Sequence, residues 1–218
     1  MIGFYNYTVI LTYGGLLTSI FGIFLTFNHH FLAAMFCLVI SGICDMFDGI
    51  VARSCKNRSD EAKIFGIQID SLCDLICFGV FPGIFNYIFT LNFISNSSKF
   101  RFAAMVSSAL LILCAVIRLG YFNVMEMIRQ KETAESRKYY QGLPVTSIAG
   151  FLPLLFTFRE LFGSNIFYIV LNIFTLLVAF FFVLDIKVPK PHKKGIIVMS
   201  VCGMVMLTVL ALQGLKIL

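Results

Sequence analysis

Residues 41–74 read SGICDMFDGIVARSCKNRSDEAKIFGIQIDSLCD. A polar, basic loop separates two apolar segments, and each segment carries two aspartates: Asp45 and Asp48, then Asp70 and Asp74. An ionised carboxylate near the centre of a bilayer-spanning helix costs about 2.5–3.5 kcal/mol on insertion scales. Because such acids are expensive, they mark candidate functional sites, and these four aspartates are the candidates in this chain.

The composition of the whole chain predicts a membrane protein. Hydrophobic residues make up 59% of the 218 residues and charged residues only 13%, against about 45–50% and about 25% in an ordinary soluble domain. So few polar side chains cannot cover a surface that faces water. A lipid bilayer is therefore the expected solvent.

Apolar stretches of membrane-crossing length recur along the chain. They cover residues 7–27, 31–52, 65–92, 102–127, 143–158, 164–185 and 195–215. Pro82 lies inside the third stretch and is expected to kink it. We predict an all-α, polytopic helical bundle of about six to eight transmembrane helices. Residues 1–218 would form a single membrane domain, with a catalytic core at about residues 7–150 and C-terminal helices at 151–218.

The net charge of +6 has an uneven distribution. Twelve Lys and Arg residues lie in the loops 53–64, 128–142 and 186–194, whereas the alternate loops and the C-terminus hold four. The positive-inside rule places the three basic loops in the cytosol. This predicts an integral protein of a prokaryotic cytoplasmic membrane with its active site facing the cytosol. The basic residues of these loops then either reflect the topology alone or also bind anionic lipid. No nucleic acid is expected as a partner.

The spacing of the aspartates predicts two facing stripes. Asp45 and Asp48 are three residues apart, and Asp70 and Asp74 are four apart, so each pair shares one helix face. The two helices would be antiparallel, and four inward carboxylates would repel each other unless cations bind them. Carboxylate oxygens suit Mg²⁺ or Mn²⁺. The alternative is that the acids cap helices or pair with basic residues, namely Arg53, Arg58 and Arg118.

Small residues continue both stripes and leave room for a ligand. They are Gly49, Ala52 and Gly66. With them the motif reads DMFDGIVAR, then GIQIDSLCD. It resembles the signature DxxDGxxAR…GxxxDxxxD of the CDP-alcohol phosphotransferase family, and every fixed position is present. One departure is the 12-residue segment between Arg53 and Gly66, which is longer than usual in the family.

The resemblance implies the family's fold and chemistry. It implies two divalent cations, Mg²⁺ or Mn²⁺, held by Asp45, Asp48, Asp70 and Asp74, with Asp74 also the general base. It implies a nucleotide site made of Asp48, Gly49, Ala52, Arg53 and Gly66. By analogy with the family, a homodimer is expected.

Three further runs resemble the phosphatidylserine synthases of this family. They are DSLCDLICFGVFP at 70–82, RLGYFN at 118–123 and YQGLPVT at 140–146. They imply that CDP-diacylglycerol and L-serine are the substrates and that phosphatidylserine and CMP are the products. They also add candidates for binding the acceptor or a phosphate: Arg118, Tyr121, Asn123, Gly142 and Pro144. Tyr121 stands where an arginine is usual, which weakens any role for that position.

Alternatives remain open at this point. Arg118 binds a substrate anion or pairs with the aspartates or Glu126. Glycerol 3-phosphate or inositol phosphate could replace serine, but a phosphorylated acceptor should need more inward arginines than Arg118 alone. A divalent-cation transporter would show metal flux without CDP-lipid. If the protein were a non-catalytic membrane scaffold, Asp74→Asn would leave its function intact.

Overall fold

Helices dominate the structure, a computed structural model that describes residues 9–54, 59–94, 98–132, 139–189 and 193–215. The helices are α1 (Ile10–Phe27), α2 (Phe31–Ser54), α3 (Asp60–Asp74), the π-helix η2 (Leu75–Val80), α4 (Phe81–Phe93), α5 (Ser98–Glu132), the 3-10 helix η3 (Val145–Ser147), α6 (Ile148–Thr157), α7 (Arg159–Phe162), α8 (Ser164–Val183) and α9 (Lys193–Gly214). Each predicted apolar stretch contains helix, so the predicted all-α membrane bundle is confirmed.

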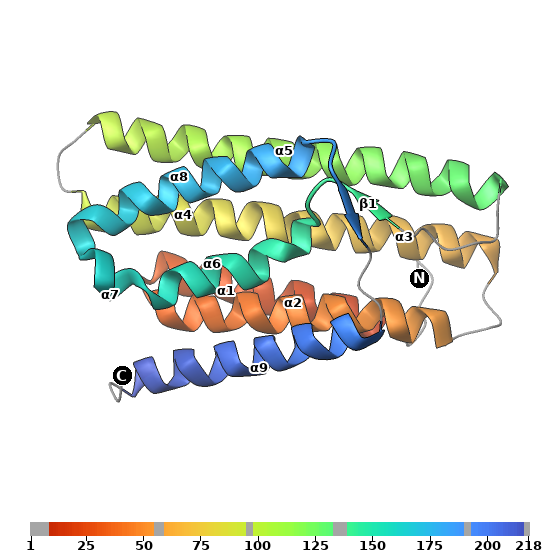
Figure 1. The fold of residues 1–218 in the computed structure, drawn as a ribbon, viewed down its shortest axis with the longest axis horizontal. Coiled ribbons are helices and arrows are strands. Elements are labelled where there is room, and N and C mark those ends of the chain that lie inside the picture. The colour runs from red at the N-terminus through yellow and green to blue at the C-terminus, as the bar shows by residue number, and fades with distance from the viewer. Residues whose placement is uncertain (1–8, 55–58, 95–97, 133–138, 190–192, 216–218) are drawn as a thin grey trace.

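The long helices lie side by side along the longest axis of the molecule (Figure 1). Within the described residues, five helical stretches are long and apolar enough to cross a membrane. They are Ile10–Phe27, Phe31–Gly49, Glu61–Phe93, Ser98–Arg129 and Ile166–Val183. Two shorter apolar helical stretches, Val145–Thr157 and Ser200–Gly214, accompany them. Large apolar side chains such as Leu113 and Phe180 are more than half exposed, as expected for a surface that faces lipid.

α3, η2 and α4 follow one another without a break. Pro82 lies in the first turn of α4, and proline lacks an N–H and clashes with the carbonyl four residues earlier. Just before it, the N–H of Phe81 donates to the carbonyl of Ile76, five residues back. The wider π-turn thus accommodates the proline. It begins directly after Asp74, and such turns are frequent at functional sites.

A short antiparallel sheet, which the sequence did not predict, joins two of the basic loops. Strand β1 (Tyr139–Gln141) pairs with β2 (Lys187–Pro189). Gly142 follows β1 with φ +73°, and its N–H donates to the Ile186 carbonyl at 2.8 Å. A Cβ at Gly142 would lie 2.9 Å from the Phe182 carbonyl oxygen. A glycine is therefore needed here for close packing against the end of α8.

A buried polar cluster links α4, α5 and α8. The Asn86 side-chain amide donates to the hydroxyls of Ser107 and Ser108, each at 3.0 Å, and Asn172 donates to Thr90 at 2.9 Å. Such hydrogen bonds hold helices together inside a bilayer, where water does not compete for them.

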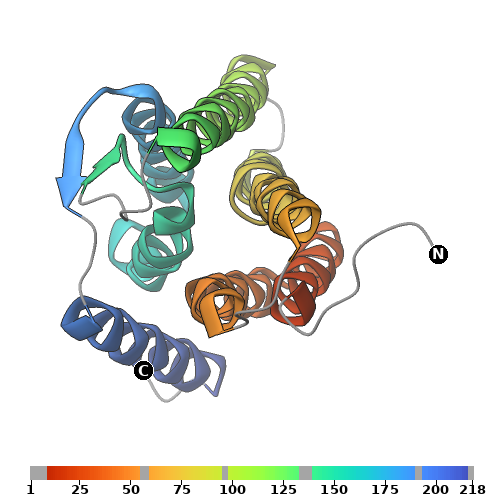
Figure 2. The same ribbon diagram turned by 90° about the vertical axis from the view of Figure 1, so that its right-hand side faces the viewer.

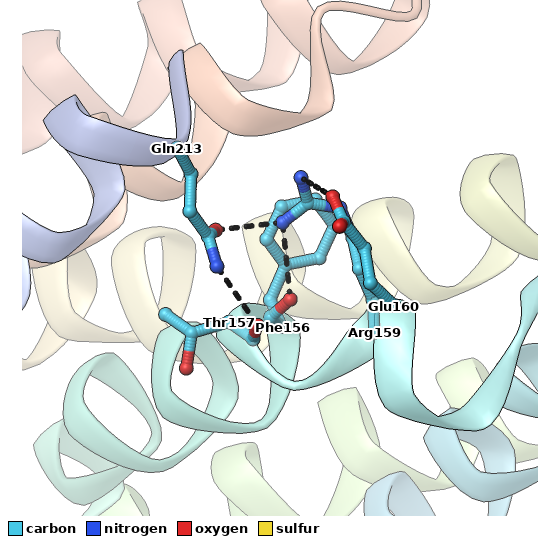
Figure 3. Close-up of polar contacts among 5 residues, drawn as sticks. All are labelled: Phe156, Thr157, Arg159, Glu160 and Gln213. Carbon is cyan, nitrogen blue, oxygen red and sulfur yellow. Dashed lines mark hydrogen bonds and ion pairs between the residues drawn. The ribbon is translucent and has the colours of Figure 1, made fainter. Parts of the chain in front are cut away.

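α9 packs against α2 and α6 at the edge of the bundle, as the end-on view shows in dark blue (Figure 2). A polar link fastens its C-terminal end (Figure 3). Arg159 donates to the Gln213 side-chain oxygen at 2.8 Å, and Gln213 donates to the Thr157 carbonyl at 2.9 Å. The guanidinium also lies 4.6 Å from the centre of the Phe156 ring and pairs with Glu160 at 3.2 Å.

Candidate active site

Three of the four aspartates converge between α2 and α3. Asp45 comes from α2, and Asp70 and Asp74 come from α3. One carboxylate oxygen of each residue lies within 4.8 Å of those of the other two. The two helices are antiparallel and joined at one end of the bundle (Figure 1), so the acids meet face to face, as their spacing predicts.

Asp48 has a different environment from the other three acids. Its side chain is 7% exposed and lies against Asp70, while Asp45 lies against Asp74. The hydroxyl of Thr12 on α1 donates to Oδ2 of Asp48 at 3.0 Å. One oxygen of Asp48 is therefore held by the protein. The sequence did not predict this contact from the first helix.

A small pocket opens beside the acids. Its lining comes from α1, α2, α3 and η2: Thr12, Gly15, Ser41, Asp45, Asp48, Cys73, Asp74, Cys77 and Phe78. The fully buried Ser19 of α1 donates to Ser41 of α2, four residues before Asp45, at 2.9 Å. Polar groups therefore continue from the carboxylates into the interface between α1 and α2.

The predicted nucleotide-binding residues lie on both sides of the loop between α2 and α3. Gly49 in α2 and Gly66 in α3 are partly buried, and Asp48 is the buried acid described above. Ala52 and Arg53 belong to the last turns of α2, but their side chains lie outside the part of the chain that the structure describes. The predicted contact of Arg53 with a nucleotide stays a prediction.

The predicted acceptor-binding residues are spread over two regions. On α5, Arg118 is 8% exposed, whereas Tyr121 is 51% exposed. Asn123 accepts a hydrogen bond from Ser71 of α3 at 2.8 Å. Gly142 and Pro144 lie in the connection from β1 to η3, where Gly142 has the packing role described above.

Glu126, the alternative partner considered for Arg118, is engaged by another cation. Arg129, one turn further along α5, forms an ion pair with its carboxylate. A carboxylate can bind more than one cation, so a substrate anion, the aspartate cluster and Glu126 all stay predicted partners of Arg118.

The donor set of the cluster fits a hard divalent cation. All the converging side-chain atoms are carboxylate oxygens, and Mg²⁺ and Mn²⁺ prefer oxygen ligands. Among the described residues, Asp45, Asp70 and Asp74 have ligand atoms close enough together to share one ion. The cluster can therefore hold a cation at the point where α2 and α3 meet.

Comparisons with known proteins agree with this chemistry. The sequence profile of a family described as CDP-alcohol phosphatidyltransferase matches residues 5–184. A CDP-diacylglycerol–serine O-phosphatidyltransferase of Methanocaldococcus jannaschii is 33% identical over 165 residues, 75% of this chain. Enzymes of the same name from Saccharomyces cerevisiae and Helicobacter pylori are 33% and 30% identical, over 62% and 66% of this chain. The resemblance inferred from the aspartate signature is confirmed.

The relatives are longer than the matched part. The matches cover 68% of the Methanocaldococcus protein, 46% of the Saccharomyces protein and 54% of the Helicobacter protein.

Proposed function

Because this chain belongs to the CDP-alcohol phosphatidyltransferase family, we propose that it transfers a phosphatidyl group from CDP-diacylglycerol to the hydroxyl of L-serine. The products are phosphatidylserine and CMP. The observation that carries the proposal is the convergence of Asp45, Asp70 and Asp74 on one point, with oxygens within 4.8 Å of one another. The names of the relatives support serine as the acceptor.

The reaction is a substitution at the lipid-side phosphorus. The serine hydroxyl oxygen forms a bond to that phosphorus, and the bond from the phosphorus to the bridging oxygen of the diphosphate breaks. CMP leaves with that oxygen. The hydroxyl proton passes to a carboxylate of the cluster, for which Asp74 is the proposed general base, because it lies deepest along its helix and lines the pocket.

The acids also define how cations would be held. Asp45, Asp48, Asp70 and Asp74 would be the ligands of two divalent cations, three of them with oxygens already close together. When bound, Mg²⁺ or Mn²⁺ would neutralise the diphosphate and stabilise the charge that develops on the phosphorus and on the departing CMP.

The remaining residues would bind the two substrates. Asp48, Gly49, Ala52, Arg53 and Gly66 would form the nucleotide site. Arg118 would bind the serine carboxylate, a role supported by the resemblance of residues 118–123 to the RLARFN run of phosphatidylserine synthases. Serine carries a single anionic group, which one buried arginine can match.

The depth of the site suits a substrate that is half lipid. α3 has 15 residues, so Asp74 lies about 21 Å along it from the basic loop at 1.5 Å per residue. A cytidine diphosphate could reach the acids from the cytosol while its acyl chains stay in the bilayer. The distribution of basic residues supports a site that faces the cytosol of a prokaryotic membrane. Analogy with the family supports a homodimer.

The test is a comparison of acceptors. Purified protein is incubated with CDP-diacylglycerol, Mn²⁺ or Mg²⁺, and labelled L-serine, glycerol 3-phosphate or inositol phosphate, and the lipid product is identified. We expect labelled phosphatidylserine and an equal amount of CMP. Preferential labelling from a phosphorylated acceptor would overturn the serine assignment while keeping the family chemistry. Metal transport into vesicles without CDP-lipid would instead support a transporter.

A further inference from the structure

A hydrogen bond between α3 and α5 lies directly beside the aspartate cluster. The Ser71 hydroxyl donates to Oδ1 of Asn123 at 2.8 Å, and both side chains are partly buried. Ser71 follows Asp70 and precedes Asp74 by three residues. Asn123 lies on the helix that carries the buried Arg118. The reaction proposed above assigns no role to Ser71.

The helix geometry places this pair on a particular side of the acids. Successive residues of an α-helix are about 100° apart around its axis, so Ser71 and Cys73 point to opposite sides of the Asp70–Asp74 stripe. Cys73 lines the pocket on the side of α1. Ser71 reaches α5. The pair therefore lies on the side of the cluster that faces α5.

The hydrogen bond determines how the Asn123 amide is oriented. An asparagine side chain has one carbonyl oxygen and one NH₂ group on the two branches of a planar amide. Because Ser71 donates to the oxygen, the NH₂ group with its two donors points the other way. A carboxylate accepts hydrogen bonds and donates none, so this orientation offers an acceptor's carboxylate the correct partner.

We infer that Ser71 is a positioning residue, which orients the Asn123 amide so that its NH₂ group donates to the carboxylate of the acceptor L-serine. This inference rests on the proposed function. It assigns selectivity for a carboxylate to the α3–α5 side of the cluster, through a hydrogen bond that keeps the amide from turning over.

A hydrogen bond that merely fastened α3 to α5 would behave differently. Its loss would lower the activity with every acceptor by the same factor. If the amide binds the carboxylate, loss of the Ser71–Asn123 hydrogen bond should lower the activity with L-serine more than the activity with L-serinamide. L-serinamide keeps the hydroxyl and the ammonium but has a neutral carboxamide. The preference for L-serine over L-serinamide is thus a readout that a purely structural role does not change.

The experiment compares kcat/KM for L-serine and L-serinamide, by CMP release, in the wild type, Asn123→Asp, Ser71→Ala and Ser71→Thr. Asn123→Asp places a carboxylate opposite the acceptor's carboxylate. We expect it to raise the KM for serine about tenfold or more and to lower the preference for serine by a similar factor. Ser71→Ala should lower the preference about three- to fivefold, and Ser71→Thr should restore it. The KM for CDP-diacylglycerol should change less than about twofold.

The matched control is Thr208→Ala on α9, which removes a hydroxyl that donates to the Val205 carbonyl of the same helix. An unchanged preference in either Asn123→Asp or Ser71→Ala would overturn the inference, as would an equal loss with the two acceptors. If Asn123→Asp fails to fold, the comparison of Ser71→Ala with Ser71→Thr decides; if Ser71→Ala fails to fold, an unchanged preference in Asn123→Asp still overturns the inference. Failure of the proposed function is distinct, because the wild type would then not use serine.

Discussion

Carboxylates that converge on one point repel each other, and a bound cation relieves that repulsion. Mn²⁺ should therefore stabilise the folded protein. A ligand at one hundred times its Kd stabilises by about 2.7 kcal/mol, so we expect a higher Tm in detergent when Mn²⁺ replaces EDTA.

Asp70→Asn removes one charge of the cluster, and we expect it to lose most of this Mn²⁺-dependent rise in Tm. Glu61→Gln is the control, because Glu61 is an exposed acid on the same helix. An equal rise for Asp70→Asn and the wild type would show that the cluster does not bind the ion.

The Thr12 hydroxyl provides a second test at a single residue. Thr12→Val keeps the shape of the side chain but leaves Oδ2 of Asp48 without its donor. An unpaired buried acceptor costs about 1–3 kcal/mol. We expect kcat/KM for CDP-diacylglycerol to fall about tenfold, and Thr12→Ser to recover most of it.

Thr18→Val on the same helix is the matched control, since the Thr18 hydroxyl donates to the carbonyl of Gly14 within α1. Comparable losses in Thr12→Val and Thr18→Val would contradict a specific role for the Thr12–Asp48 hydrogen bond.

At the residue scale, the spacing of the acids predicted their convergence, because helical periodicity places residues three or four apart on one face. The partners of these residues were not predictable in the same way. Thr12 is 36 positions from Asp48, and Ser71 is 52 from Asn123. Such pairs depend on how whole helices pack, which no local pattern encodes.

Between elements, the contact of α2 with α6 depends on a glycine. A Cβ at Gly42 would lie 2.6 Å from the Cβ of Ala149, too close without movement of the helices. Overpacking of this kind costs about 1–3 kcal/mol. We expect Gly42→Ala to lower the Tm in detergent.

Gly150→Ala is the control on the facing helix, where a new Cβ would meet nothing within 4 Å. It should be neutral or stabilising, since alanine favours helix over glycine by up to about 1 kcal/mol. A Gly42→Ala protein as stable as Gly150→Ala would contradict the close approach of α2 and α6.

At the element scale, hydropathy located each helical stretch because every membrane-crossing helix needs a long apolar run. The π-turn at Leu75–Val80 was not predicted, although Pro82 predicted a disturbance at this place. Proline removes a particular hydrogen bond, but the neighbouring helices decide whether the chain bends or widens.

For the molecule as a whole, the distribution of charge predicts which end faces the cytosol. Lys63 is exposed near the start of α3, and Leu161 is 81% exposed in α7, at the opposite end of the bundle. We expect a membrane-impermeant thiol reagent to label Leu161→Cys in intact cells, and Lys63→Cys only after permeabilisation. Both variants are made with Cys55 and Cys202 replaced by serine. Labelling of Lys63→Cys in intact cells would reverse the proposed orientation.

The overall architecture was predictable because the bilayer permits few solutions for an apolar chain. The β1–β2 pair was not, because three-residue strands carry no periodic signal. Gly142 illustrates the difference. The family resemblance suggested binding, and the structure adds a packing reason for the same residue.

The decisive measurement is the initial rate of CMP release by wild type and Asp74→Asn, with CDP-diacylglycerol, L-serine and Mn²⁺ at saturation. We expect the wild type to release CMP in a 1:1 ratio with phosphatidylserine, and only when serine and Mn²⁺ are both present. Removing a positioned general base costs about 10²–10⁴-fold, so Asp74→Asn should lose at least that much while keeping its fold, and Glu61→Gln should match the wild type. A folded Asp74→Asn protein with the wild-type rate would contradict the assignment of the aspartate cluster as the active site.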